Sequence, residues 1–212
     1  METKNINTVV FDMGQVLIHW TPFAVTEHMG LNEADMSILL KEMFQSVEWV
    51  SLDHGTLTRE QAAARVKQRI PERLWPAVEE TIFGWWRRPL KPMEGMADLV
   101  RELKQKGYHL YVLSNAGLDL REYFHRIPGA ECFEGIMVSA EEKLIKPMPA
   151  IYRRLAEKFG LDLGSCVFID DAPANIEVAI QTGMNGIQFR GDVARLRKEL
   201  RELDIDVAEA TI

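Results

Sequence analysis

The sequence predicts an α/β fold in which a Rossmann-like parallel sheet is flanked by helices and a small helical cap is inserted after the first strand. Three observations lead to this prediction. Residues 8–18 hold an apolar run that is broken by an acid and a glycine. A stretch of about 70 residues with only helical patterns follows, up to residue 88. Beyond it, short apolar runs alternate with amphipathic helical patterns, which is typical of parallel strands joined by right-handed crossovers.

The length and charge of the chain fit an ordinary enzyme. Its 212 residues are enough for a main domain with an insertion. We therefore place a Rossmann-like catalytic core at residues 1–18 and 89–212, and the cap at residues 19–88. The formal net charge is −7, and the basic residues are scattered along acidic helices. This pattern argues against a nucleic-acid-binding surface.

The sequence also predicts a cytoplasmic protein without a membrane partner. No window holds the roughly 18 uninterrupted apolar residues that a membrane span needs, and the N-terminus has no apolar signal region. Cys132 and Cys166 allow one disulfide but have neither CxxC nor zinc-site spacing. Buried apolar thiols are the better expectation. Nothing in the sequence indicates an oligomeric state.

The first strand begins at Thr8 and is expected to deliver Asp12 to the edge of the sheet. β-Branched and aromatic residues in one short run fit a strand that is covered on both faces. Ligands of α/β proteins gather at the carboxyl ends of such strands. Taken alone, Asp12 also fits a simple cap of a turn or helix.

Helical signals dominate the segment that follows. Thr21-Pro22 reads as an N-cap followed by proline at the first helical position. Residues 58–61 form a capping box that opens a helix, and Pro71 is expected to end it. A further helical pattern covers residues 74–86. This run without a convincing strand is the predicted cap.

The remaining elements alternate between helix and strand. We expect helices at residues 96–106, from about 118, and at 149–159, 174–182 and 193–203, and strands at 109–113, 135–138, 166–169 and 186–189. We expect the residues after 203 to be frayed.

Polar residues follow nearly every core strand. Ser114-Asn115, Lys146 and Asp170-Asp171 come after three of them, and Asp12 follows the first. In a parallel sheet these ends lie on one edge, so the carboxylates would repel each other unless a cation lay among them. Oxygen ligands without histidine or cysteine suit Mg²⁺. Ser114, Lys146 and the backbone N–H groups after Asp12 are suitable donors for a substrate phosphate.

The order of these residues resembles the haloacid dehalogenase-like hydrolase superfamily, most of whose members are Mg²⁺-dependent phosphatases. The four motifs that carry the resemblance are Phe-Asp12-Met-Gly, Leu-Ser114-Asn115, Lys146-Pro147 and Ile-Asp170-Asp171-Ala-Pro-Ala-Asn175. The Asp-x-Gly form of the first motif, together with residues 54–58, is similar to a branch that includes glucose-1-phosphate phosphatases. The resemblance covers essentially the whole chain.

The resemblance implies a role for each site residue. Asp12 would be the nucleophile that forms an aspartyl-phosphate, with Lys146 as the second catalytic residue. The metal ligands would be Asp12, the Gly14 carbonyl, Asp170 and Asp171, and Asn175 would orient a water on the metal from the second shell of the site. Substrate phosphate would be bound by Met13, Gly14, Ser114, Asn115 and Lys146.

One departure from the family pattern leaves the reaction open. Most phosphatases of this family carry a second aspartate two residues after the nucleophile, which serves as acid and base, and this chain has Gly14 there. A Mg²⁺-dependent phosphatase acting on a small phosphorylated metabolite, a sugar phosphate first, is the favoured expectation. One alternative is a metal-independent 2-haloacid dehalogenase, since those enzymes also lack the second aspartate. The other is a catalytically weak phosphosugar-binding protein.

The acidic pair Asp170-Asp171 favours the phosphatase, because dehalogenases use no metal and need no such pair. Aromatic and basic residues near the two hinges have an open role. His19 and Trp20 either line the substrate cavity or are buried at the hinge. The run Trp85-Trp86-Arg87-Arg88 either contacts substrate, packs the cap against the core, or forms a dimer contact. Lys143 is expected to be a surface residue.

Overall fold

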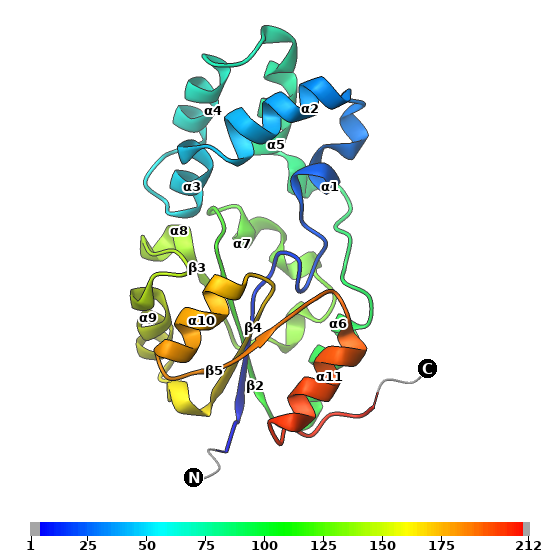
Figure 1. Ribbon diagram of the computed structural model, residues 1–212, viewed down its shortest axis with the longest axis vertical. Coiled ribbons are helices and arrows are strands. Elements are labelled where there is room, and N and C mark those ends of the chain that lie inside the picture. Colours follow the sequence, from blue (N-terminus) through cyan, green and yellow to red (C-terminus); the bar gives the residue numbers. More distant parts are fainter. Residues whose placement is uncertain (1–4, 210–212) are drawn as a thin grey trace.

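The computed structural model describes residues 5–209 and has the predicted α/β fold. Within the described residues, five parallel strands form one sheet in the order β3-β2-β1-β4-β5. The strands are β1 (Thr8–Phe11), β2 (His109–Ser114), β3 (Gly135–Val138), β4 (Cys166–Asp170) and β5 (Asn185–Gln188). Helices flank the sheet on both faces (Figure 1).

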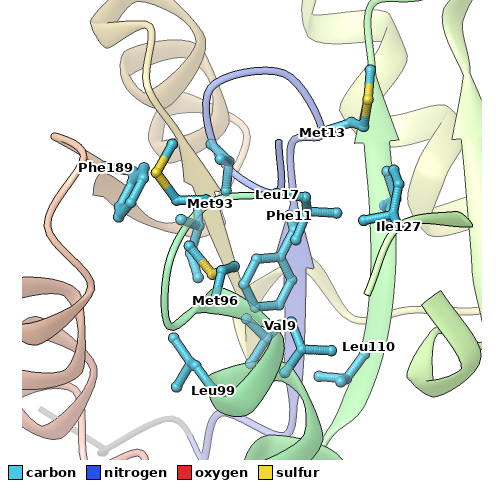
Figure 2. Packing of buried hydrophobic residues seen from close by; sticks show 14 of the residues in the cluster. Val9, Phe11, Met13, Leu17, Met93, Met96, Leu99, Leu110, Ile127 and Phe189 are labelled. Carbon is cyan, nitrogen blue, oxygen red and sulfur yellow. The ribbon is translucent and has the colours of Figure 1, made fainter. Parts of the chain in front are cut away.

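One face of the sheet packs on α6 and α11. These helices run over Met96–Gln105 and Val193–Glu202. Val9 and Phe11 of β1 belong to the same buried cluster as Met96 and Leu99 of α6, and Figure 2 shows these side chains together. Alternate side chains of β1 point to the same face of the sheet, and side chains spaced about 3.6 residues apart share one face of α6. The apolar residues on these two faces therefore pack against each other.

The opposite face of the sheet packs on α9 and α10, which run over Pro149–Phe159 and Pro173–Gln181. Val10 lies in this second cluster with Tyr152 and Ile176. Each central strand is therefore buried on both sides, which explains its continuous apolar run.

The chain between β1 and α6 folds into helices. They are α1 (Pro22–Thr26), α2 (Glu33–Leu39), α3 (Val47–Asp53), α4 (Arg59–Lys67) and α5 (Trp75–Phe83). Their buried residues, among them Leu39, Ala62 and Val78, form a cluster separate from the two at the sheet. Figure 1 shows these helices grouped beyond the carboxyl ends of the strands. The division at residues 19 and 88 stays a prediction.

The predicted helix starts are confirmed by their hydrogen bonds. Thr21 Oγ1 accepts from the Ala24 N–H at 3.0 Å, and Thr58 with Gln61 forms the expected capping box. The role predicted for Pro71 is wrong, because α4 already ends at Lys67.

Two further expectations differ from the structure. The helix expected from about residue 118 is one turn, α7 (Leu120–Tyr123). The C-terminal segment is not frayed as far as it is described: Ile205 and Val207 are buried, and the Asp206 N–H donates to the Tyr108 hydroxyl at 2.8 Å. Alternate apolar residues let this short segment pack on the core. Residues 210–212 lie outside the described residues.

The two cysteines are free and buried, as expected from their spacing. None of the helices between residues 5 and 209 is both long enough and apolar enough to cross a bilayer.

Candidate active site

Asp12 follows the central strand and lies almost fully buried at its carboxyl end. Its N–H donates to the Ile169 carbonyl at 2.8 Å, which extends the pairing of β1 with β4 by one residue. The next residues turn back sharply, because the N–H groups of Leu17 and Ile18 both donate to the Met13 carbonyl. This turn fixes the carboxylate of Asp12 at the edge of the sheet.

Lys146 forms a buried ion pair with two carboxylates. Its Nζ lies 2.8 Å from Oδ1 of Asp12 and 2.7 Å from Oδ2 of Asp170. It also donates to the Leu113 carbonyl at 3.1 Å. Burial acts to lower the pKa of Lys146, but the two carboxylates outweigh burial and hold that pKa above its ordinary value. The lysine is therefore a cation held within the site.

The side chain of Asn115 holds the backbone of Lys146. Asn115 Nδ2 donates to the Lys146 carbonyl at 3.0 Å, and Asn115 Oδ1 accepts from the Lys146 N–H at 2.8 Å. The amide thus fixes the loop that carries the lysine. The end of β2 and the segment after β3, which bears α8 (Ser139–Glu142), are joined at this point.

Asp170 is fully buried and held from three sides. Besides Lys146, the Ala172 N–H donates to its Oδ1 at 2.8 Å, and Asn175 Nδ2 lies 3.0 Å from both of its oxygens. Asn175 therefore contacts Asp170 directly. Asp171 is the most exposed of the three acids at this edge.

Asp12, Asp170 and Asp171 form one carboxylate cluster, since each offers an oxygen within 4.8 Å of the others. Burial raises the pKa of Asp12 to about 6, against the opposing charge of Lys146. Burial, with the neighbouring charge of Asp170, also raises the pKa of Asp171. The negative charge on this edge exceeds what one lysine neutralises, as at a site built for a cation.

A cavity of about 760 Å³ opens over this edge, between the helical segment and the sheet. Aromatic side chains form much of its wall, with Trp20, Trp49, Trp85, Trp86 and Tyr123 among the lining residues. These rings contact one another, as in the pairs Trp20–Trp49 and Trp85–Tyr123, whose centroids lie 5.7 and 5.1 Å apart. The cavity is of a size that suits a small-molecule ligand.

The structure brings all of the predicted site residues to one region, in two layers. Those that line the cavity are Asp12, Met13, Gly14, Ser114, Asn115 and Asp171. Lys146, Asp170 and Asn175 lie behind that surface, tied to it by the contacts above. The catalytic, metal-binding and substrate-binding roles of these residues stay predictions.

The hinge residues whose role was open divide into two groups. Trp20, Trp85 and Trp86 line the cavity, whereas His19 and Arg87 are exposed and lie outside its lining. Trp86 also packs against the core side of the molecule, where its Nε1 donates to Glu122 at 3.1 Å.

Three contacts dock the loop after α3 on the core. Ser139 Oγ donates to the Asp53 carbonyl at 2.5 Å, and His54 Nε2 lies 2.8 Å from the Lys143 carbonyl. The Lys143 ammonium in turn donates to the Gly55 carbonyl. Lys143 is exposed as predicted, but it bridges the two parts of the molecule and lines the cavity.

Three further carboxyls line the cavity without a role predicted from the sequence: Asp53, Asp119 and the exposed Glu60. Burial, reinforced by the charge of Asp119, raises the pKa of Asp53 to about 7. Burial likewise raises the pKa of Asp119 to about 6. Both lie outside the four motifs, and their burial depends on the docking of the helical segment. The only sequence signal was the position of Asp53, directly before the segment 54–58.

Comparison with known proteins supports the family that the four motifs indicate. The family model for haloacid dehalogenase-like hydrolases matches residues 6–183. The chain is 27% identical over 199 residues to the sesquiterpene phosphatase astK of Aspergillus oryzae, covering 92% of this chain and 94% of that protein.

Two solved structures share the fold. A HAD family enzyme from Bacteroides thetaiotaomicron, in complex with magnesium and inorganic phosphate, superimposes with a TM-score of 0.67 at 20% identity, over 91% of this chain and 99% of the other. The L-2-haloacid dehalogenase of Xanthobacter autotrophicus does so with a TM-score of 0.64 at 16% identity, over 95% and 85% of the two chains. The fold is therefore shared by a protein that binds magnesium and inorganic phosphate and by a haloacid dehalogenase. The extent of the family match, with the four motifs at one sheet edge, shows that the chain belongs to the haloacid dehalogenase-like hydrolases.

Proposed function

We propose that the chain is a cytoplasmic Mg²⁺-dependent phosphatase that hydrolyses a small phosphorylated metabolite through an aspartyl-phosphate on Asp12. The observation that carries this proposal is the cluster of Asp12, Asp170 and Asp171, whose carboxylate oxygens lie within 4.8 Å of one another at the floor of the cavity. The similarity to a sesquiterpene phosphatase over nearly the whole chain supports the same reaction type.

The donor set fits Mg²⁺. Asp12 and Asp171 reach the cavity, Asp170 lies directly behind them, and the carbonyl of Gly14 is the predicted fourth ligand. These are hard oxygen donors, and the cluster contains neither histidine nor cysteine. A Mg²⁺ ion bound there supplies positive charge that lets an anionic carboxylate approach an anionic phosphate ester.

The chain's own residues then perform phosphoryl transfer in two displacements. The Asp12 carboxylate attacks phosphorus, and the bond to the leaving oxygen breaks. Lys146, which is tied to Asp12, compensates negative charge during the attack, and Ser114 with the N–H groups of Met13 and Gly14 offers donors to the phosphoryl oxygens. Water next attacks the aspartyl-phosphate, which releases phosphate and restores Asp12.

Asn115 and Asn175 have positioning roles in this proposal. Asn115 fixes the backbone of Lys146, and Asn175 holds both oxygens of Asp170. Their hydrogen bonds keep the lysine and the acid in place before substrate binds. Asn115 also lines the cavity, where it is available to a substrate oxygen.

A sugar phosphate is the first proposed substrate class, because indole rings such as those of Trp20 and Trp85 stack on sugar faces. The same aromatic wall favours a second class, a phosphate ester with an extended apolar group. The relative from Aspergillus oryzae, a sesquiterpene phosphatase, supports the second class. Hydrolysis of glucose 1-phosphate and of an isoprenyl phosphate, measured side by side, separates the two.

The dehalogenase alternative is weaker because Asp171 adds a carboxylate that metal-free chemistry does not need. The test is a panel of phosphate esters assayed with and without Mg²⁺, for the wild type and for Asp12→Asn. We expect Mg²⁺-dependent phosphate release that is lost in the variant. Chloride release from a 2-haloacid in the presence of EDTA would support the dehalogenase instead. Mg²⁺-dependent ligand binding without turnover of any ester would support the binding protein.

A further inference from the structure

Gly14 leaves the first motif without the acid that most phosphatases of this family carry there. A Cβ built on Gly14 meets only the Cβ of Trp20, at 3.7 Å, which is an ordinary contact. The position therefore has room for a side chain. A proton donor for the leaving oxygen has to come from another element that reaches the same cavity.

We propose that Asp53, at the end of α3, is the general acid and general base of the reaction. This inference rests on the proposed phosphatase function and assigns to the helical segment a proton transfer that the first motif cannot supply. Asp53 and Asp12 line the same cavity, Asp53 at the end of α3 in the helical segment and Asp12 at the edge of the sheet.

The carboxyl of Asp53 is free to reach a substrate. It accepts no hydrogen bond from any residue between 5 and 209 and forms no ion pair there. Its backbone is held instead: the Asp53 carbonyl accepts from Ser139 Oγ, and Ser139 Oγ itself accepts from the Ala116 N–H at 2.9 Å. A fixed backbone with an unpaired carboxyl is the arrangement that a proton-transfer group needs.

The backbone at Gly55 fixes this geometry further. Gly55 has a φ of +66°, and a Cβ built there would lie 2.1 Å from the Ala140 carbonyl oxygen. The loop after α3 therefore approaches the core as closely as only a glycine permits. Asp53, two residues earlier, is set over the cavity by this contact.

The charges that face Asp53 favour its protonated form at neutral pH. Asp119, from the loop before α7, and Asp12, after β1, are negative, while Lys146 is the opposing positive charge. Arg59 of α4 also lines the cavity and faces Asp119. Position at the C-terminal end of α3 disfavours a negative charge as well. The resulting pKa of about 7 is suited to both giving and taking a proton.

Of the other two cavity carboxyls without an assigned role, Glu60 is exposed and hydrogen bonding lowers its pKa, and Asp119 is less suitable than Asp53. The charges that act on Asp119 are those of Arg59 and Glu122, whereas Asp53 is affected by Asp12 and Lys146. The charge of the nucleophile Asp12 therefore acts on the pKa of Asp53. Asp119 keeps Asp53 protonated through its negative charge.

Asp53 gives one proton and takes one back in each catalytic cycle. In the first displacement the bond from phosphorus to the leaving oxygen breaks, the electron pair goes to that oxygen, and the Asp53 carboxyl protonates it to the free alcohol. In the second, the Asp53 carboxylate takes a proton from water as the water oxygen bonds to phosphorus. The bond between phosphorus and Asp12 breaks, phosphate leaves, and both side chains return to their initial states.

The test compares two esters whose leaving groups differ in their need for a proton. We expect Asp53→Asn to lower kcat/KM by about 10²–10⁴-fold for an alkyl phosphate, and by less than about tenfold for 4-nitrophenyl phosphate, whose leaving group departs as an anion. The alkyl-ester pH profile of the wild type should fall above about pH 7. The variant should lose that limb, whereas Asp119→Asn should move it to lower pH.

Glu72→Gln is the matched control, since it makes the same acid-to-amide change on the exposed surface of the helical segment. Equal losses on both esters in Asp53→Asn, or no loss on the alkyl ester, would overturn the role of Asp53 while the phosphatase stands. A wild type that cleaves neither ester, or full activity in Asp12→Asn, would instead contradict the proposed function itself. Circular dichroism of Asp53→Asn separates loss of folding from loss of the acid.

Discussion

The Nζ of Lys146 lies 2.8 Å from Oδ1 of Asp12, with the lysine side chain only 1% exposed. The same cation contacts Asp170, which is fully buried. Because the pair is shielded from water, its removal leaves carboxylates without their counter-charge. The ion pairs of Lys146 therefore hold this edge of the sheet together in addition to their proposed part in the reaction.

Lys146→Met should destabilise the protein by about 3–5 kcal/mol at pH 8, as expected for a buried charge that loses its partner. The loss should shrink toward pH 5, since Asp12, whose pKa burial already raises, then takes a proton in the folded state. Urea unfolding at both pH values measures the effect. Lys104→Met, which breaks an exposed pair with Glu134, is the control. Equal losses in the two variants would contradict this account.

Asp53→Asn should stabilise the protein at alkaline pH even as it lowers activity on an alkyl phosphate. The pKa of Asp53 is raised to about 7, so between about pH 4 and 7 the folded state keeps a proton that the unfolded state has lost. The free energy of unfolding of the wild type therefore falls as the pH rises through this window. We expect the variant to be more stable than the wild type by about 1–3 kcal/mol at pH 8 in EDTA, and nearly equal at pH 4.5. A stability difference independent of pH would show that the proton is not involved.

Gly55→Ala should disturb the docking of the loop that carries Asp53. A Cβ there meets the Ala140 carbonyl at 2.1 Å, so the loop has to move away from the core. We expect kcat/KM for an alkyl phosphate to fall by about tenfold or more. Gly30→Ala is the matched control, because Gly30 has a φ of +63° and no atom within 4 Å of the added Cβ. An equal loss in both variants would mean that backbone strain, not docking, explains the effect.

A second acid at position 14 should replace Asp53. The Cβ of a Gly14→Asp variant makes only an ordinary contact with Trp20, so the fold should tolerate the change. In the double variant Asp53→Asn, Gly14→Asp we expect alkyl phosphatase activity to recover by about tenfold or more over Asp53→Asn alone. Steady-state assays of both variants with the alkyl ester measure the recovery. Recovery of 4-nitrophenyl phosphatase activity alone would contradict a shared proton-transfer role.

The sequence predicted the sheet and its polar edge because those features are local. Nearly every strand is an apolar run followed by polar residues, and a parallel sheet places the carboxyl ends of its strands along one edge. The positions of Asp12, Ser114 and Asp170 at the sheet edge could therefore be predicted from the apolar runs that precede them. The N-caps at Thr21 and Thr58 could be predicted because their hydrogen bonds join residues within one helical turn.

The position of Asp53 over the cavity could not be predicted in the same way. It depends on a contact between the Asp53 carbonyl and Ser139, which is 86 residues away in the chain. Helical periodicity says which face of α3 is apolar, but not where that helix docks. The packing of the C-terminal segment could not be predicted for a similar reason. Ile205 and Val207 are buried, and the segment is held by contacts with residues far away in the chain, such as Tyr108.

The most direct measurement of the central claim is mass spectrometry of the enzyme quenched in acid during turnover of a phosphate ester with Mg²⁺. We predict that the peptide containing Asp12 gains the mass of one phosphoryl group, that hydroxylamine removes it, and that Asp12→Asn shows none. Steady release of phosphate with an unmodified Asp12 peptide, or with the phosphoryl group on another residue, would contradict the account.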